Sequence, residues 1–463
     1  MTEKEINYTE PAEFNEREIE KLVGIDIYST PEIKGIGGTY KSSYKDFIVK
    51  EITNKGKILQ IKEDYPSPPF LDEKDRYTTF NLIKINKDTF EAVRELEKFL
   101  KIDSNFISYS GLKDKCAISV QKISIKGNFV EKLKRLKIRD SFYRCITPTK
   151  KPVKLGENWG NNFTIVIRSI PNIKKIEKEV ENLIDLISSC GFPNYYGLQR
   201  YGMYRPNSHI VGKHLLDGDY EKAFYEFTAT IYSTESPRVQ NIRSMVNKEN
   251  NLEKVYDAFP NYLFYEKLMI KHLLDNPKDF KGCFDVIPND LKNLLISAFQ
   301  SFIFNNLISL RVKMGIPLLK PVKGDVISVL EDDNSNVTQI KYIYGNNDKI
   351  YDKYLKEAIM LNRAVIVVPL IGYDTNLDDF PLIKDLYNIL IKETNINEDI
   401  FKSNLMYQYQ FKGSFRAMII KPTGLKTIQL KDDDLFPNKK SLRFEFSLPK
   451  GTYATMLLRE IIK

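Results

Sequence analysis

The sequence is poor in the residues that build metal centres and disulfide frameworks. Its 463 residues include only four cysteines and three histidines. The cysteines are widely spaced and form no C-x-x-C pair, which disfavours both a zinc site and a disulfide framework. His209 and His214 are five positions apart, whereas two metal-binding histidines on one helix face are separated by four. This composition disfavours metal-dependent hydrolysis and Ser-His-Asp catalysis.

Long apolar runs and glycine-rich cofactor turns are also missing from the sequence. It contains no stretch of about 18 apolar residues, and its first residues lack the apolar core of a secretory signal. We therefore expect a cytoplasmic protein without a membrane partner. The nearest glycine cluster, residues 35–38, precedes the first predicted strand. It does not fit the cofactor turn that an RNA methyltransferase would need after a strand.

Positive charge is concentrated in one part of the chain, whose net charge is +9. Between Lys122 and Lys154, eleven Lys and Arg residues are opposed only by Glu131 and Asp140, so this window alone accounts for the net charge. Such a patch is typical of a surface that binds a phosphate backbone, and a solubilising surface is the alternative. The predicted backbone contacts are Lys132, Lys134, Arg135, Lys137, Arg139, Lys150, Lys151 and Lys154.

The hydrophobic pattern predicts an α+β fold, and the length allows two or three domains. Residues 44–52 are predicted to form a strand with Phe47, Val49 and Glu51 on one face. A second strand is expected at 79–85, followed by a helix capped by Asp88 and Glu91. The apolar stripe of this helix is predicted to contain Phe90, Val93, Leu96 and Leu100. Further strands are expected at 163–170, 326–330, 337–343, 365–370, 414–421 and 442–448, with a helix at 174–189 and mostly helices from 205 to 312.

Residues 111–121, with the sequence G-L-K-D-K-C-A-I-S-V-Q, place Asp114 between two lysines. An aspartate in a basic setting stays ionised and can act as a nucleophile. Taken alone, a K-D-K triplet is more often a solvated turn. Adjacent side chains of an extended segment point to opposite faces, so Lys113 and Lys115 need not touch Asp114. Both lysines are expected to be solvated or to face phosphate.

Four further segments extend this pattern. They are D-F-I-V-K-E within residues 41–52, G-N-N-F at 160–163, P-N-Y-Y-G-L-Q-R-Y-G at 193–202 and F-S-L-P-K-G-T-Y-A-T-M-L-L-R-E at 446–460. With residues 111–121, they resemble the segments of the TruD family of tRNA pseudouridine synthases, in the same order. Residues 297–305 and 324–325 resemble weaker marks of that family. The polar residues within 193–202 disfavour burial of this loop in a core.

The resemblance implies an α+β pseudouridine synthase core with a mixed antiparallel sheet and a large inserted α/β domain, the TRUD domain. The core is expected to comprise residues 1–205 and 412–463. Residues 206–411 are then expected to form the inserted domain. Such a split domain is feasible when the ends of an insertion lie close together.

The resemblance also implies the reaction, which is isomerisation of a specific tRNA uridine, at position 13, to pseudouridine without a cofactor or metal. Asp114 is the implied nucleophile, although attack on the base, attack on the sugar and proton abstraction all stay open. Lys41 is implied to keep Asp114 ionised. Asn194 would hydrogen-bond the flipped uracil, and Phe47, Tyr196 and Tyr453 would hold or stack on it.

Two alternatives remain at this point. A non-catalytic RNA-binding protein would retain the basic window and the aromatic residues but would not need Asp114. The other alternative is a pseudouridine synthase that acts on another tRNA position or on another RNA. The resemblance implies tRNA as the partner and no obligate protein partner.

Overall fold

The computed structural model describes residues 16–70, 76–248, 251–331, 336–346 and 349–463. They form two compact units. The first, here called the sheet unit, consists mainly of Tyr28–Phe192 and Ile420–Lys463. The second, the helical unit, consists of Pro193–Asp333 and Val337–Ile419 together with α1 (Glu16–Leu22). The chain thus passes between the units at 27/28, 192/193 and 419/420. The sequence, in contrast, predicts domain boundaries at 205/206 and 411/412.

The sheet unit contains an eight-stranded mixed sheet in the order β13-β14-β6-β1-β4-β2-β5, with β3 paired to β4. All of its strand pairs are antiparallel except β1 with β4. The predicted mixed antiparallel sheet is therefore present. The strands are β1 (Phe47–Ile52), β2 (Tyr77–Ile85), β3 (Ile107–Tyr109), β4 (Ile118–Lys126), β5 (Ser141–Thr149), β6 (Gly160–Pro171), β13 (Thr423–Asp432) and β14 (Lys439–Pro449).

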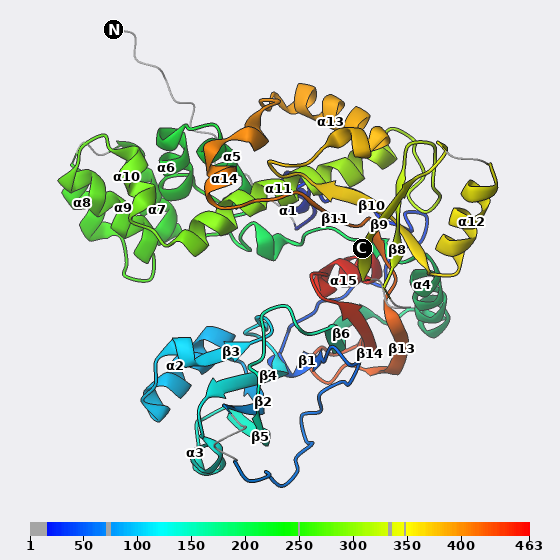
Figure 1. The fold of residues 1–463 in the computed structure, drawn as a ribbon, viewed down its shortest axis with the longest axis horizontal. Helices are drawn as coiled ribbons and strands as arrows, with labels where there is room; N and C mark the ends of the chain where they lie inside the picture. Colours follow the sequence, from blue (N-terminus) through cyan, green and yellow to red (C-terminus); the bar gives the residue numbers. More distant parts are fainter. Residues whose placement is uncertain (1–15, 71–75, 249–250, 332–335, 347–348) are drawn as a thin grey trace. The chain divides into compact units, whose positions relative to one another are not determined.

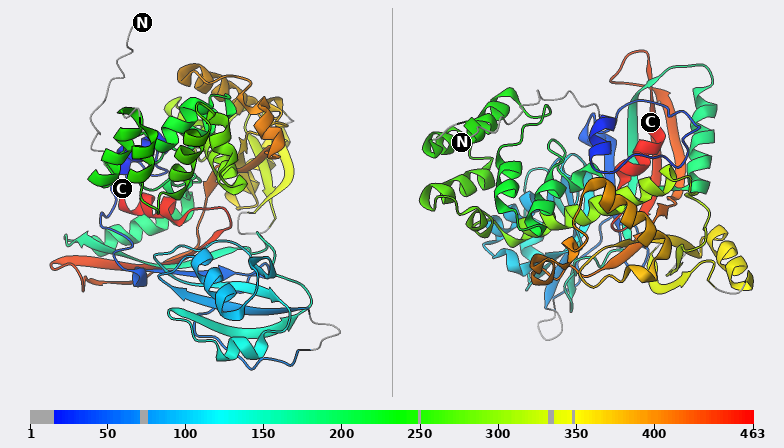
Figure 2. Two further views of the ribbon diagram at one scale, coloured as in Figure 1. Left: turned by 90° about the vertical axis from the view of Figure 1, so that its left-hand side faces the viewer. Right: turned by 90° about the horizontal axis from the view of Figure 1, so that it is seen from above.

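A row of phenylalanines forms one part of the core of this unit. Phe163 on β6 stacks on Phe446 of β14 at 5.2 Å and meets the edge of Phe47 on β1 at 6.1 Å. All three side chains are buried. Helices α4 (Ile176–Cys190) and α15 (Ala454–Ile462) lie alongside these strands (Figure 2). The alternating apolar residues of the predicted strands therefore do face a core.

A second core lies at the other end of the sheet, where α2 (Thr89–Leu100) and α3 (Val130–Arg135) join β2, β3, β4 and β5. Asp88 caps α2 as predicted, because its carboxylate accepts a hydrogen bond from the backbone N–H of Glu91. The prediction for Phe90 was wrong, since this side chain is 53% exposed. Ala92 and Thr89 occupy the buried face of the helix instead, beside Val93, Leu96 and Leu100.

The helical unit is built around α11 (Asn289–Lys313) and a four-stranded sheet in the order β11-β10-β8-β9 (Figure 1). Among the described residues, α11 is the one helix long and apolar enough to cross a membrane, yet 72% of its most apolar window is buried inside the protein. It is the central core helix of this unit, and it packs against β10.

The remaining elements complete the helical unit. Its strands are β8 (Val326–Leu330), β9 (Val337–Ile343), β10 (Ala364–Leu370) and β11 (Ser414–Ala417), and the short strands β7 (Phe192–Pro193) and β12 (Ile419–Ile420) mark the two boundaries. Its other helices are α5 (Ser208–Leu216), α6 (Tyr220–Thr228), α7 (Pro237–Lys248), α8 (Leu252–Ala258), α9 (Phe264–Asp275), α10 (Phe280–Asp285), α12 (Lys349–Met360), α13 (Pro381–Thr394) and α14 (Asn404–Gln408).

Candidate active site

The parallel pairing of β1 with β4 sets the position of Asp114. Ile48 of β1 lies opposite Ile118 of β4. Because the strands run in the same direction, the segments that precede them lie at the same end of the sheet. Lys41 precedes β1 and Asp114 precedes β4. The two predicted residues are thereby brought together from distant parts of the chain.

Lys41 and Asp114 form an ion pair. The Lys41 ammonium donates a hydrogen bond to Oδ2 of Asp114 at 3.0 Å. The Asp114 side chain is 46% exposed, so its carboxylate can be reached by a substrate while the neighbouring ammonium stabilises its negative charge. The backbone of Lys41 has a φ of 61°, in the left-handed region that lysine seldom adopts.

Phe47 contributes to the site by contacting the side chain of Lys41. The Lys41 ammonium lies 4.4 Å from the centroid of its ring, a cation–π contact. The ring itself is buried in the phenylalanine core. Phe47 therefore supports Lys41 directly, and a contact between its ring and the substrate stays a prediction.

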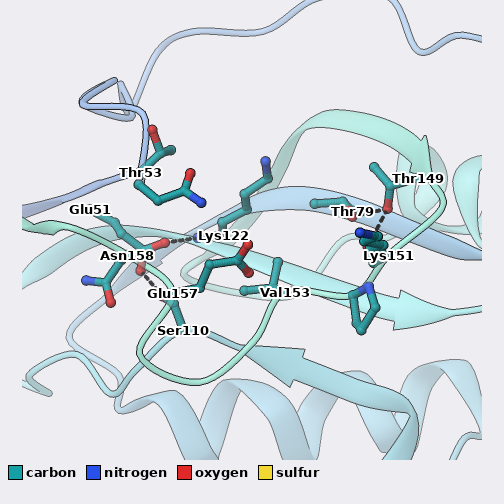
Figure 3. A pocket seen from close by; sticks show the side chains of 12 residues that line it. Glu51, Thr53, Thr79, Ser110, Lys122, Thr149, Lys151, Val153, Glu157 and Asn158 are labelled. Carbon is teal, nitrogen blue, oxygen red and sulfur yellow. Dashed lines mark hydrogen bonds between the residues drawn. The ribbon is translucent and has the colours of Figure 1, made fainter.

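A buried ion pair supports the Asp114 loop. Lys113 Nζ lies 2.9 Å from Oε2 of Glu51, and the two side chains are only 3% and 2% exposed. Glu51 also accepts hydrogen bonds from the hydroxyl of Ser110 at 2.6 Å and from the backbone N–H of Lys122 at 3.2 Å. Figure 3 shows these two contacts in the wall of a pocket of about 160 Å³. The expectation that Lys113 is solvated or faces phosphate was wrong, because Glu51 provides a buried partner.

Lys115 and Lys84 differ sharply in their surroundings. Lys115 is exposed and lies 3.5 Å from Glu91, as expected for a solvated lysine. Lys84, on β2, is fully buried, and its amine donates to the backbone carbonyls of Lys87, Lys113 and Asp114. Neither Lys84 nor Glu51 was predicted as a site residue. A lysine within an otherwise apolar run, as in Leu82-Ile83-Lys84-Ile85, was the available signal for the former.

Asn194 and Tyr196 belong to the helical unit. Asn194 is buried, and its amide donates to the carbonyl of Ala417 at 2.8 Å and accepts from the guanidinium of Arg416. The same guanidinium lies 4.1 Å from the centroid of the Tyr196 ring. Nothing in the sequence around Arg416 indicated this position. Arg416 therefore joins Asn194 to Tyr196, and the uracil contacts assigned to these two residues stay predictions.

The segment 193–202 is more deeply buried than its polar residues suggested. Tyr195 and Tyr201 are almost fully buried, which corrects the expectation against a core position. Asn305 of α11 explains how polar groups are accommodated there. Its side chain bonds the backbone N–H and carbonyl of Tyr196 and the hydroxyl of Tyr201. The buried hydroxyl of Tyr201 thus has a hydrogen-bond partner.

The other predicted site residues belong to the sheet unit. Tyr453 is partly buried and occupies the N-cap position of α15. The side chains of the predicted basic patch are all exposed, on α3 and in the segments before and after β5. These residues are Lys132, Lys134, Arg135, Lys137, Arg139, Lys150, Lys151 and Lys154. The patch is accessible to a large anionic partner.

Comparison with known proteins connects this geometry to a family. The family model described as tRNA pseudouridine synthase D (TruD) matches residues 22–461. The chain belongs to the TruD family. The resemblance in the five segments therefore reflects kinship over nearly the whole chain.

Individual TruD relatives are of nearly the same length. A Methanosarcina mazei protein named "Probable tRNA pseudouridine synthase D" is 32% identical over 457 residues, covering 96% of this chain and 98% of its own. A Methanocaldococcus jannaschii protein named "Probable tRNA pseudouridine synthase D 1" is 31% identical, covering 92% and 96%. A crystal structure of a Methanosarcina mazei TruD protein gives a TM-score of 0.75 at 30% identity, over 96% of this chain and 98% of that one. This structural match confirms the α+β pseudouridine synthase fold that was predicted from the sequence.

Proposed function

We propose that this protein is a tRNA pseudouridine synthase that isomerises uridine 13 with Asp114 as the reacting carboxylate. The observation that supports this best is the Lys41–Asp114 pair at 3.0 Å, formed by two segments that match the TruD family. Relatives that cover nearly the whole chain are named as tRNA pseudouridine synthases. A half-exposed carboxylate paired with an ammonium provides the reactive group that the reaction requires.

In this reaction the N1–C1′ bond of uridine breaks, the base turns, and a C5–C1′ bond forms. The proton on C5 leaves and N1 gains one, so the product is an isomer of the substrate. Asp114 acts on the base, on C1′ or on the C5 proton, and each role needs an ionised and accessible carboxylate. Lys41 holds that carboxylate in place. The basic patch contacts the tRNA backbone, which helps to offset the few kcal/mol needed to extract a base from its stack.

The decisive experiment measures tritium release from tRNA transcribed with [5-³H]uridine. The native protein should release tritium, because the C5 hydrogen must leave. Asp114→Asn keeps the size and shape of the side chain without its charge, and we expect no release by this variant at unchanged tRNA affinity. Lys115→Ala, a neighbouring exposed charge change, is the control and should retain activity. Tight binding of tRNA without release by the native protein would instead favour the RNA-binding alternative.

The position of the target uridine needs a separate test. A transcript with cytidine at position 13 and tritiated uridine elsewhere should release no tritium. Undiminished release from this transcript would refute position 13 while leaving the isomerase activity intact.

A further inference from the structure

Lys84 presents an unusual combination of charge and burial. It lies in the interior strand β2, between β4 and β5, and its side chain is 0% exposed. Its amine makes no ion pair with any carboxylate of the described residues and donates instead to three backbone carbonyls. Burying an ammonium without a counter-ion is costly, and it is tolerated only where all of its N–H groups are bonded. The three acceptors around Lys84 therefore account for its presence here.

Two of these acceptors belong to the Asp114 loop. Lys84 Nζ donates to the carbonyl of Lys87 at 2.6 Å, to that of Lys113 at 3.2 Å and to that of Asp114 itself at 2.8 Å. Fixing two successive carbonyls fixes the peptide planes on both sides of the Asp114 backbone. Because Cβ of Asp114 is attached to the Cα between those planes, the direction of the Cα–Cβ bond is fixed with them, and the Lys41 ammonium then holds the carboxylate at 3.0 Å.

Other contacts hold the earlier part of the loop. The carbonyl of Gly111 accepts from the amide of Gln121, and the backbone N–H of Lys113 donates to the hydroxyl of Thr89. The buried Glu51–Lys113 ion pair secures the side chain of Lys113. The contact that reaches the backbone carbonyl of Asp114 itself comes from Lys84.

The charges of Lys84 and Asp114 also interact. Burial lowers the pKa of Lys84 to about 8, and the negative charge of Asp114 is the largest influence that opposes this lowering. The charge of Asp114 thus acts on the Lys84 ammonium in addition to the hydrogen bond that the ammonium donates to the backbone carbonyl of Asp114.

We propose that Lys84 is a positioning residue for Asp114, orienting the reacting carboxylate through the backbone carbonyls of residues 113 and 114. This inference deepens the proposed function and depends on Asp114 being the reacting group. Lys84 does not touch the substrate. Its contribution is to geometry, and catalysis is sensitive to geometry because a misplacement of about 1 Å can lower a rate by about 100-fold.

The test compares Lys84→Met with Leu82→Ala, a substitution two residues away on β2 that also disturbs the buried core. Methionine is similar in length to lysine and is apolar like the methylene stem of lysine, but it cannot donate a hydrogen bond to the carbonyls. Single-turnover tritium release at saturating tRNA gives the rate of the chemical step, filter binding gives the tRNA affinity, and thermal unfolding gives stability. Native protein and Asp114→Asn are measured in parallel.

We expect Lys84→Met to lower the single-turnover rate by about 100-fold with tRNA affinity within about twofold of native. Leu82→Ala should lower the melting temperature at least as much while keeping most of the rate. A Lys84→Met rate within about threefold of native, or an equal loss of rate in Leu82→Ala, would overturn the proposal.

A second variant covers the case in which Lys84→Met does not fold. Lys84→Gln retains a shorter donor, and it should lose rate without losing affinity, judged by the same limits. Failure of the proposed function would look different, because the native protein would then release no tritium, or Asp114→Asn would release as much as the native protein.

Discussion

At the scale of single residues, the candidate site consists of an exposed reacting pair above a buried supporting layer. Asp114 and Lys41 are partly open to solvent, whereas Glu51, Lys113 and Lys84 are buried beneath the loop. Exposed pairs contribute little to stability, but breaking a buried pair leaves a charge without compensation. Substitutions in the two layers should therefore have different consequences for folding.

The Glu51–Lys113 pair gives the first prediction. Glu51→Gln should lower the free energy of unfolding by about 3–5 kcal/mol, because the buried Lys113 ammonium loses its counter-ion. Urea unfolding measures the change. Glu445→Gln is the control. Its partners Lys50 and Lys426 lie at 3.8 and 4.0 Å and none of the three side chains is buried, so a loss below about 1 kcal/mol is expected. Equal losses in the two variants would contradict this prediction.

Lys84 gives a prediction about pH. Burial lowers its pKa from the ordinary 10.5 to about 8. At pH values between these two pKa values, Lys84 is protonated in the unfolded chain but has lost its proton in the folded chain. The contribution of Lys84 to the free energy of unfolding therefore rises with pH. The stability of the native protein relative to Lys84→Met should increase by about 2 kcal/mol over roughly two pH units, from about 7.5 to about 9.5. Urea unfolding of both proteins at the two pH values checks this, and a constant difference would contradict it.

At the scale of elements, close backbone approaches define how helices and strands meet. Gly212 of α5 faces α11 in the helical unit, and an added Cβ would lie 2.1 Å from the carbonyl oxygen of Leu295. This contact is with backbone, which cannot move aside cheaply.

Gly212→Ala should therefore destabilise the protein by about 1–3 kcal/mol, despite the higher helix propensity of alanine. Thermal unfolding should show a lower melting temperature. Lys213→Ala, on the neighbouring and less buried position of α5, is the control and should change stability much less. A stabilised Gly212→Ala variant would mean that the two helices do not approach as closely as described.

The helices and strands also show which features could be predicted from the local sequence pattern. The cap of α2 at Asp88 and the alternation of β1 follow from short-range chemistry, so both could be predicted. Phe90 and segment 193–202 could not be placed correctly. Both errors concern which side of an element packs against another element, and this packing depends on residues distant in the sequence. For example, Asn305 of α11 makes the hydrogen bonds that allow segment 193–202 to be buried.

At the scale of the whole molecule, positive charge is unevenly distributed. The basic patch of residues 132–154 is exposed and accounts for much of the net charge. A polyanion that binds there releases counterions, so the affinity depends steeply on salt. The charge would then determine where tRNA first contacts the sheet unit.

Replacing Lys150, Lys151 and Lys154 by alanine should weaken tRNA binding and flatten its salt dependence. The log–log slope should fall by about 0.7–0.9 for each phosphate that the patch no longer neutralises. Filter binding at several salt concentrations measures both effects. The matched control removes the same charge from α12, as Lys349, Lys353 and Lys356→Ala, and should change the slope less. An equal effect of the two triple variants would identify the patch as ordinary surface.

The sequence by itself determined the family, the candidate reacting pair and the strand and helix periodicity, because these reside in short segments whose residues act locally or match a known pattern. It also located the positive charge. Only the tertiary structure decided the partners of Lys113 and Lys84 and the burial of segment 193–202. The physical reason is strand order. The parallel pairing of β1 with β4 and the antiparallel pairing of β4 with β2 place Glu51 and Lys84 beside the Asp114 loop, and no local pattern specifies which strands become neighbours.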